Sequence, residues 1–180
     1  MAYLTDAEKQ RLGPLIMPFE RCERIDKLRR IEEGEGDRNE FIDFIHDGYD
    51  NHSPQDCMKI TPGELAYMLK KADRPGSFKK KSYLWVIDGS SIKIIREKTS
   101  NFRRTINPDY VCHTNLTGSG SAYVGGEIYF CSDGKFYINY FSDRYGNPSL
   151  KLWKAAKRYI RSVGYMPLID IIDLLNKKKK

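Results

Sequence analysis

Hydrophobic residues recur at helical spacing near the start of the chain, at Phe19, Cys22, Ile25, Leu28 and Ile31. This spacing predicts a helix over about residues 18–33 with its apolar stripe facing the core. Three helix-start signals, each a side-chain acceptor followed three residues later by a carboxylate, are Thr5 with Glu8, Asp37 with Glu40 and Thr61 with Glu64. Gly13-Pro14 should end the first helix. We therefore predict three or four helices within residues 1–82.

The period of the pattern changes at Tyr83, where apolar runs typical of strands replace the helical spacing. Residues 83–88 and 92–97 flank a Gly-Ser-Ser turn and predict a hairpin. A third strand is expected near residues 110–114. The strongest hairpin signal joins residues 122–131 to residues 135–141 through Asp133-Gly134, a dipeptide typical of tight turns.

Helical spacing returns after the predicted sheet. One helix is expected over about residues 149–163, closed by Gly164, and a last helix over about residues 167–176. The pattern therefore predicts an α+β fold with N-terminal helices, a central antiparallel β-sheet of about five strands and two C-terminal helices. Residues 1–82 form the N-terminal helical region, and residues 83–180 complete one compact domain with it.

Composition fits a self-sufficient domain. The chain has 180 residues, of which 40% are hydrophobic and 12% aromatic, so it can bury a core without help. It has no apolar run of about 18 residues, and its opening residues lack the features of a signal peptide. We therefore expect no membrane segment and a cytoplasmic location.

Cysteine and histidine spacing gives no sign of a disulfide framework or a metal site. The cysteines Cys22, Cys57, Cys112 and Cys131 are far apart and contain no Cys-x-x-Cys pair, which favours thiols in a reducing compartment. A zinc site built from His46, His52 and Cys57 would match no standard ligand spacing. No metal and no other cofactor is expected.

Charge leaves a nucleic-acid partner open. The formal net charge is +7, but the four lysines at positions 177–180 account for much of it. Basic residues that have the means to contact RNA or another nucleic acid are Lys79, Lys80, Lys81, Arg103, Arg104, Lys157, Arg158 and Arg161. The N-terminal helices are a second candidate surface, for a protein partner.

The candidate chemistry is concentrated in the central block, where reactive side chains lie beside glycines. Five residues form the candidate catalytic set: His113, Glu127, Ser142, Arg144 and Tyr145. A histidine that follows a strand can act as a general acid or base near neutral pH. The neighbouring Gly125 and Gly126 indicate a bulge or a surface that another group approaches closely, either a substrate or a packed ring.

Hairpin geometry predicts which of these residues meet. A two-residue Asp133-Gly134 loop would place Glu127 opposite Tyr140, because residues then pair outward one by one. Glu127, Tyr140, Ser142 and Arg144 would share one face of the sheet. The other face would carry the more apolar set and pack on the helices, which predicts that Glu127 and Arg144 meet in the open.

The central block contains three motifs, His113-Thr114-Asn115-Leu116-Thr117-Gly118, Gly125-Gly126-Glu127 and Ser142-Asp143-Arg144-Tyr145-Gly146. Together they resemble a pattern in uncharacterised bacterial proteins, and more loosely some C-terminal domains of bacterial polymorphic toxins. The resemblance covers about residues 83–165, and Asp143 stands where the pattern often has glycine. It implies a small bacterial or phage enzyme domain of the toxin or effector type.

Three functions compete at this point. A metal-independent ribonuclease-like domain, similar in architecture to the barnase-type ribonucleases, would use Glu127 as base, His113 as acid and Arg144 to stabilise the charged phosphorane, with Tyr145 beside them. An ADP-ribosyltransferase-like domain would use similar residue types, although its glutamate normally comes last in the chain. A non-catalytic factor that binds nucleic acid or protein is the third.

Overall fold

The computed structural model describes residues 3–19, 57–70, 81–96, 113–118, 120–142 and 144–177. Within these ranges the helices are α1 (Asp6–Leu12), α4 (Pro62–Lys70), α5 (His113–Leu116), α6 (Leu150–Ser162) and α7 (Ile171–Lys177). The strands are β1 (Lys59–Ile60), β2 (Tyr83–Asp88), β3 (Ile92–Arg96), β4 (Ala122–Cys131), β5 (Phe136–Ile138) and β6 (Leu168–Asp170). Residues 20–33 of the expected second helix and the whole of the expected helix near residue 37 lie outside the described ranges, whereas Pro18 and Phe19 are described and are not helical.

The strands form one sheet of mixed direction, in the order β3-β2-β4-β5-β6, with β1 pairing with β4 off this path. β2 pairs antiparallel with β3 and β4, and β4 pairs antiparallel with β5. β1 runs parallel to β4, and β6 runs parallel to β5. The expected all-antiparallel sheet is therefore wrong at these two short strands, whereas the α+β class is confirmed.

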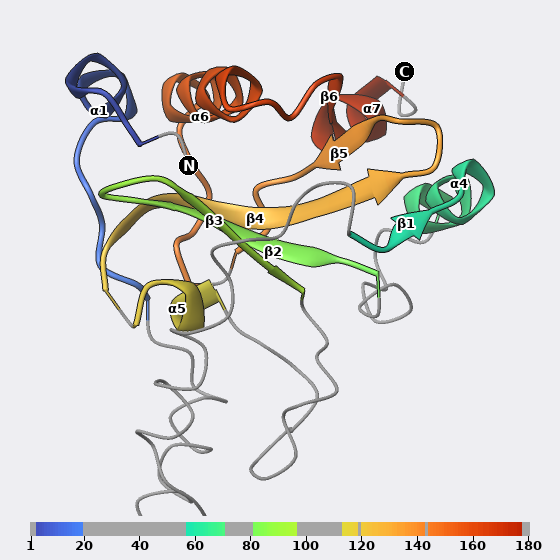
Figure 1. Ribbon diagram of the computed structural model, residues 1–180, viewed down its shortest axis with the longest axis horizontal. Helices are drawn as coiled ribbons and strands as arrows, with labels where there is room; N and C mark the ends of the chain where they lie inside the picture. Colours follow the sequence, from blue (N-terminus) through green and yellow to red (C-terminus); the bar gives the residue numbers. More distant parts are fainter. Residues whose placement is uncertain are drawn as a thin grey trace, which may run out of the picture.

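Helices cover both faces of the sheet (Figure 1). α1 and α6 lie on one face, where the largest apolar cluster includes Trp85, Ile128 and Trp153. α5 lies on the opposite face, where Leu116 and Tyr145 pack with Leu84 and Val86. A third cluster joins β1, α4 and α7 to the neighbouring part of β4 and β5.

The predicted helix starts are confirmed where the structure describes them. Thr5 and Glu8 form a complete capping box at α1, and Gly13 ends that helix. At α4 the Thr61 backbone N–H donates to Glu64 Oε2 at 2.7 Å, and the Glu64 backbone N–H donates to Thr61 Oγ1 at 3.2 Å. These bonds satisfy backbone N–H groups that a helix start would otherwise leave unpaired.

Two short segments differ from their predicted type. His113 begins the helix α5 instead of ending a strand, and residues 110–112 lie outside the described ranges. Leu168–Asp170 form β6, so the expected last helix begins later, at Ile171. Short apolar segments fit either type locally, and here the β5 edge determines the outcome by accepting a parallel partner.

The β4–β5 turn is one residue longer than predicted. Cys131 N–H donates to Lys135 O at 2.9 Å and Gly134 N–H donates to Cys131 O at 3.0 Å, so the loop has three residues, 132–134. Gly134 has a φ of 82°, the left-handed conformation that this loop type requires at its third position. The shift places Glu127 opposite Asn139 instead of Tyr140, since Ile128 pairs with Ile138.

Candidate functional site

The register between β4 and β5 reverses the predicted faces of β5 and of the residues after it, whereas Ile128 and Phe130 of β4 face the helices as predicted. A slip of one residue moves every side chain of a strand to the other face. Tyr140 accordingly packs its ring against Trp153 of α6, with 5.1 Å between ring centroids. Asn139, expected on the helix-covered face, lies instead beside Glu127. The predicted grouping of Glu127 with Tyr140 is therefore wrong.

The Glu127 carboxylate is held through one of its two oxygens. Tyr129 Oη donates to Glu127 Oε2 at 2.9 Å, and Asn139 Nδ2 donates to the same oxygen at 2.9 Å. Among the hydrogen bonds of the described residues, none ends on Oε1. Glu127 is partly exposed, so the arrangement fixes the direction of a carboxylate and leaves one oxygen for another group.

Asn139 hydrogen-bonds both to the Glu127 carboxylate and to the neighbouring backbone. Its Oδ1 accepts from the backbone N–H of Glu127 at 3.0 Å and from that of Phe141 at 2.9 Å, which leaves Nδ2 as the donor to Glu127. Asn139 is 2% exposed and Tyr129 is 5% exposed. Because both donors are buried and anchored by packing, they restrict the rotation of the Glu127 side chain.

Gly126 permits the approach of Asn139. The chain after β5 crosses so closely that a Cβ at position 126 would lie 2.1 Å from Asn139 O. Trp85 Nε1 donates to the carbonyl oxygens of Glu127 and Asn139, at 3.2 Å each, and joins the two segments. The close approach that the paired glycines indicated is thus made by the protein's own backbone at Gly126.

His113 lies on the same sheet face as Glu127. Its ring packs over Gly125, where an added Cβ would be 3.1 Å from His113 Cδ2. Gly125 and Glu127 are two residues apart on β4, so they face the same side of the sheet. The histidine is 8% exposed, and its Nε2 lies 2.9 Å from Gly126 O. A carbonyl oxygen only accepts, so Nε2 carries the proton in this bond. His113 thereby holds the strand backbone next to Glu127.

The three remaining candidate residues form the turn after the sheet. Ser142 Oγ accepts from the Tyr145 backbone N–H at 3.2 Å, and Arg144 O accepts from the Phe19 backbone N–H at 2.6 Å. Tyr145 is 2% exposed, and its hydroxyl donates to Gly120 O at 2.8 Å. The structure therefore brings His113, Glu127 and Tyr145 to one face. The expected meeting of Glu127 with Arg144 is not among the ion pairs of the described residues.

The proposed basic contacts are only partly within the described ranges. Lys79, Lys80, Arg103 and Arg104 lie outside them. Lys81 forms an ion pair with Glu64 at 2.7 Å, so its charge is partly neutralised by the first turn of α4. Lys157 is likewise paired with Asp170.

The described residues contain no group of three or more His, Cys, Asp or Glu side chains with the geometry of a metal site. His46 and His52 lie outside the described ranges. Cys57 and Cys131 are buried, and burial raises the pKa of the Cys131 thiol. Of the helices within the described ranges, none has both the length and the apolar character that a membrane crossing needs.

The sequence did not reveal Tyr129 and Asn139 as partners of Glu127. Tyr129 lies two residues from Glu127 and faces the same side of β4, which alternation alone could have shown. The position of Asn139 beside Glu127 could not be predicted, because it depends on the length of the loop between β4 and β5. Comparisons with protein-family models, with curated proteins and with solved structures give no match.

Proposed function

We propose that this chain is an enzyme in which Glu127 acts as a general base, and that its reaction is metal-independent cleavage of RNA. The observation that carries the proposal is the carboxylate fixed through Oε2 by Tyr129 and Asn139. A positioned base contributes most when its direction is set before the substrate arrives. Glu127 Oε1 is the atom that would accept the proton.

The proposed reaction uses the 2′-hydroxyl of the substrate as nucleophile. Glu127 accepts the 2′-hydroxyl proton, the 2′ oxygen attacks the adjacent phosphorus, and the bond from phosphorus to the 5′ oxygen breaks. The departing 5′ oxygen takes a proton from water, and the protonated Glu127 gives its proton to the hydroxide that remains, which restores both the carboxylate and the water. The products are a 2′,3′-cyclic phosphate and a free 5′-hydroxyl. His113 enters as a positioning residue, through its bond to Gly126 O.

The test is cleavage of a labelled RNA oligonucleotide in the presence of a chelator. Glu127→Gln keeps the shape of the side chain but cannot accept the proton, and should lower the rate by about 100-fold or more. Glu64→Gln is the matched control, because it makes the same chemical change at α4 and should cleave at the wild-type rate. Thermal melts establish that both variants are folded.

Tyr129→Phe separates orientation from chemistry. It removes one of the two donors to Oε2 and should lower kcat by roughly tenfold, consistent with about 1.5–3 kcal/mol for a hydrogen bond to a charged group that is partly replaced by water. Wild-type rates in both Glu127→Gln and Tyr129→Phe would refute the proposal. Release of nicotinamide from NAD⁺ that depends on Glu127, with no RNA cleavage, would replace it by an ADP-ribosyltransferase.

A further inference from the structure

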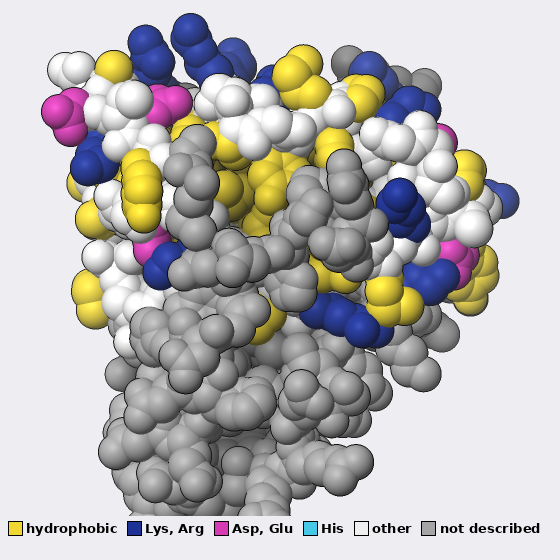
Figure 2. Space-filling view, viewed as in Figure 1, with side chains coloured by type: hydrophobic (Ala, Val, Ile, Leu, Met, Phe, Trp, Pro, Cys, Tyr) yellow, Lys and Arg dark blue, Asp and Glu magenta, His cyan; other side chains and the backbone are white. Residues whose placement is uncertain are grey.

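The outer face of α6 is uniformly basic. The helix contains no acidic residue, and its exposed charged side chains are Lys151, Lys154, Arg158 and Arg161. Their spacing places them in one row along the helix, about 15 Å long at 1.5 Å per residue. Figure 2 shows Lys and Arg side chains gathered along this edge of the molecule, over α1 and α6. We call this row together with Arg11 of α1 the α6 basic face.

Within the described ranges, the exposed cations of α6 form no ion pair with a carboxylate, and Arg11 interacts electrostatically with Glu8. Lys157 points inward, and its Nζ pairs with Asp170. Within the described ranges, no ion pair joins a carboxylate to Lys151, Lys154 or Arg158. A row of like charges raises its own electrostatic free energy, which an anion with matching spacing would lower.

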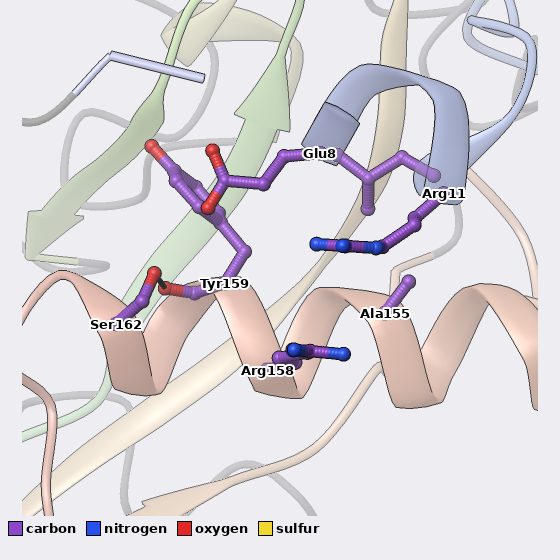
Figure 3. Close-up of a pocket in the computed structure, with 7 residues that line it drawn as sticks. Glu8, Arg11, Ala155, Arg158, Tyr159 and Ser162 are labelled. Carbon is purple, nitrogen blue, oxygen red and sulfur yellow. Dashed lines mark hydrogen bonds between the residues drawn. The ribbon is translucent and has the colours of Figure 1, made fainter. Parts of the chain in front are cut away.

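A pocket of about 220 Å³ opens between α1 and α6 next to this row. Figure 3 shows that the guanidinium groups of Arg11 and Arg158 lie on one side of the pocket, from the two helices. The Glu8 carboxylate lies toward Tyr159 and Ser162 at the other side. Glu8 is already engaged, because Thr5 donates its backbone N–H and its hydroxyl to Glu8 Oε2 at 2.8 Å each.

The size and charge of the pocket fit a phosphate group. Its volume lies below the usual range of about 300–1,000 Å³ for pockets that enclose a whole drug-sized ligand. Two guanidiniums from separate helices line the pocket, and the planar N–H groups of arginine bind phosphate oxygens well. A single small anion would still leave Lys151, Lys154 and Arg161 without an ion pair among the described residues, so the ligand should carry phosphates in series.

We propose that the α6 basic face binds the sugar-phosphate backbone of a nucleic acid strand, with one phosphate held between Arg11 and Arg158. A membrane surface fits less well, because the apolar side of α6 is already used: Trp153, Ala156 and Ile160 are buried in the core and cannot enter a bilayer. The face is independent of the proposed catalytic carboxylate, since α6 covers the sheet face opposite to α5 and His113.

Fluorescence anisotropy with a labelled single-stranded RNA measures this binding. The full chain with Glu127→Gln is used throughout, so that cleavage does not disturb the measurement. The test variant is Arg11→Glu with Arg158→Glu, and the matched control is Lys59→Glu with Lys70→Glu, exposed positions on β1 and α4. Both double variants have the same net charge. We expect the test variant to bind at least about tenfold more weakly than the control, as expected when phosphate contacts are lost.

The salt dependence of the binding constant reports how many phosphates the protein contacts. For a single strand the slope of log K against log salt is about −0.7 for each phosphate contact. The test variant should therefore have a slope shallower by about 1.4 than the control between about 50 and 200 mM salt. If the reversed charges unfold the chain, Arg11→Gln with Arg158→Gln removes the same contacts without adding repulsion.

Three results would overturn the inference. Equal weakening in the test and control variants would show that net charge alone drives binding. Binding to vesicles rich in phosphatidylserine without binding to RNA would make the face a membrane contact. No RNA binding at about 50 mM salt would show that a nucleic acid strand is not the ligand of this face. Equal weakening leaves the role of Glu127 to the cleavage assay, whereas a complete failure to bind RNA would also count against RNA cleavage.

Discussion

The two adjacent glycines of β4 should respond very differently to alanine. A Cβ at Gly126 would lie 2.1 Å from Asn139 O and 2.8 Å from Tyr140 Cα. Both are backbone atoms, which cannot rotate away as the end of a side chain can. A Cβ at Gly125 would lie 3.1 Å from His113 Cδ2 and 3.1 Å from Trp85 O, a contact that a shift of a few tenths of an ångström relieves.

The magnitude follows from the contacts that must move. Forcing the segment at Asn139 away from β4 costs about 1–3 kcal/mol as overpacking. It also breaks the bonds of the Trp85 indole N–H, and a buried donor left unsatisfied costs a further 1–3 kcal/mol or so. We expect Gly126→Ala to lower the free energy of unfolding by about 4 kcal/mol and Gly125→Ala by about 1 kcal/mol or less, since alanine also restricts the unfolded chain.

Urea unfolding followed by tryptophan fluorescence measures both changes, and Trp85 itself reports the rearrangement. A loss of 4 kcal/mol corresponds to a fall in Tm of roughly 8–16 °C for a chain of this size. In an RNA-cleavage assay, Gly126→Ala should also lose activity below its melting temperature, because Asn139 no longer reaches Glu127. Equal losses of stability in the two variants would refute the close crossing at Gly126.

Three further predictions concern the rest of the fold. Asp170→Ala should lower the free energy of unfolding by about 3 kcal/mol, because it removes the acceptor of Trp153 Nε1 and leaves the nearly buried Lys157 ammonium with only the more distant and exposed Asp173 carboxylate, 3.8 Å away; a double-mutant cycle with Lys157→Met checks this. The Asp133 carboxyl should titrate in carbon NMR with a pKa of about 2 instead of 3.8, chiefly because Lys135 donates to it. The stability from this pair is therefore present above the ordinary pKa and is lost as the pH falls toward 2. In Lys135→Ala the titration midpoint of Asp133 should move up. Thr5→Ala should cost about 0.5–2 kcal/mol through loss of the cap of α1, and an unchanged urea midpoint would contradict the capping role.

Elements with long or uniform patterns could be predicted from the sequence. β2 is a continuous apolar run, buried along almost its whole length at the centre of the sheet, and the hairpin to β3 follows from its turn. α6 has an apolar stripe, an N-cap at Ser149 and a basic outer face, all visible in its letters. In such segments the local sequence pattern already determines the type of secondary structure, and the tertiary contacts agree with it.

The short elements and the site depended on information that no local pattern holds. Asp133-Gly134 fits both a two-residue turn and the second and third positions of a three-residue loop. Only the pairing of Ile128 with Ile138 distinguishes the two, and it decides whether Asn139 faces Glu127 or the helices. β6 and α5 are likewise determined by the part of the sheet on which they pack.

Because β6 lies near the end of the sequence, the sheet can be completed only late in the synthesis of the chain. Leu168–Asp170 supply the parallel neighbour of β5, and Phe136 N–H donates to Pro167 O at 2.9 Å. Until those residues have left the ribosome, the β5 edge carries unpaired N–H and C=O groups, which are a template for pairing with a second nascent chain. A fragment that stops before Pro167 should therefore aggregate where the longer chain does not.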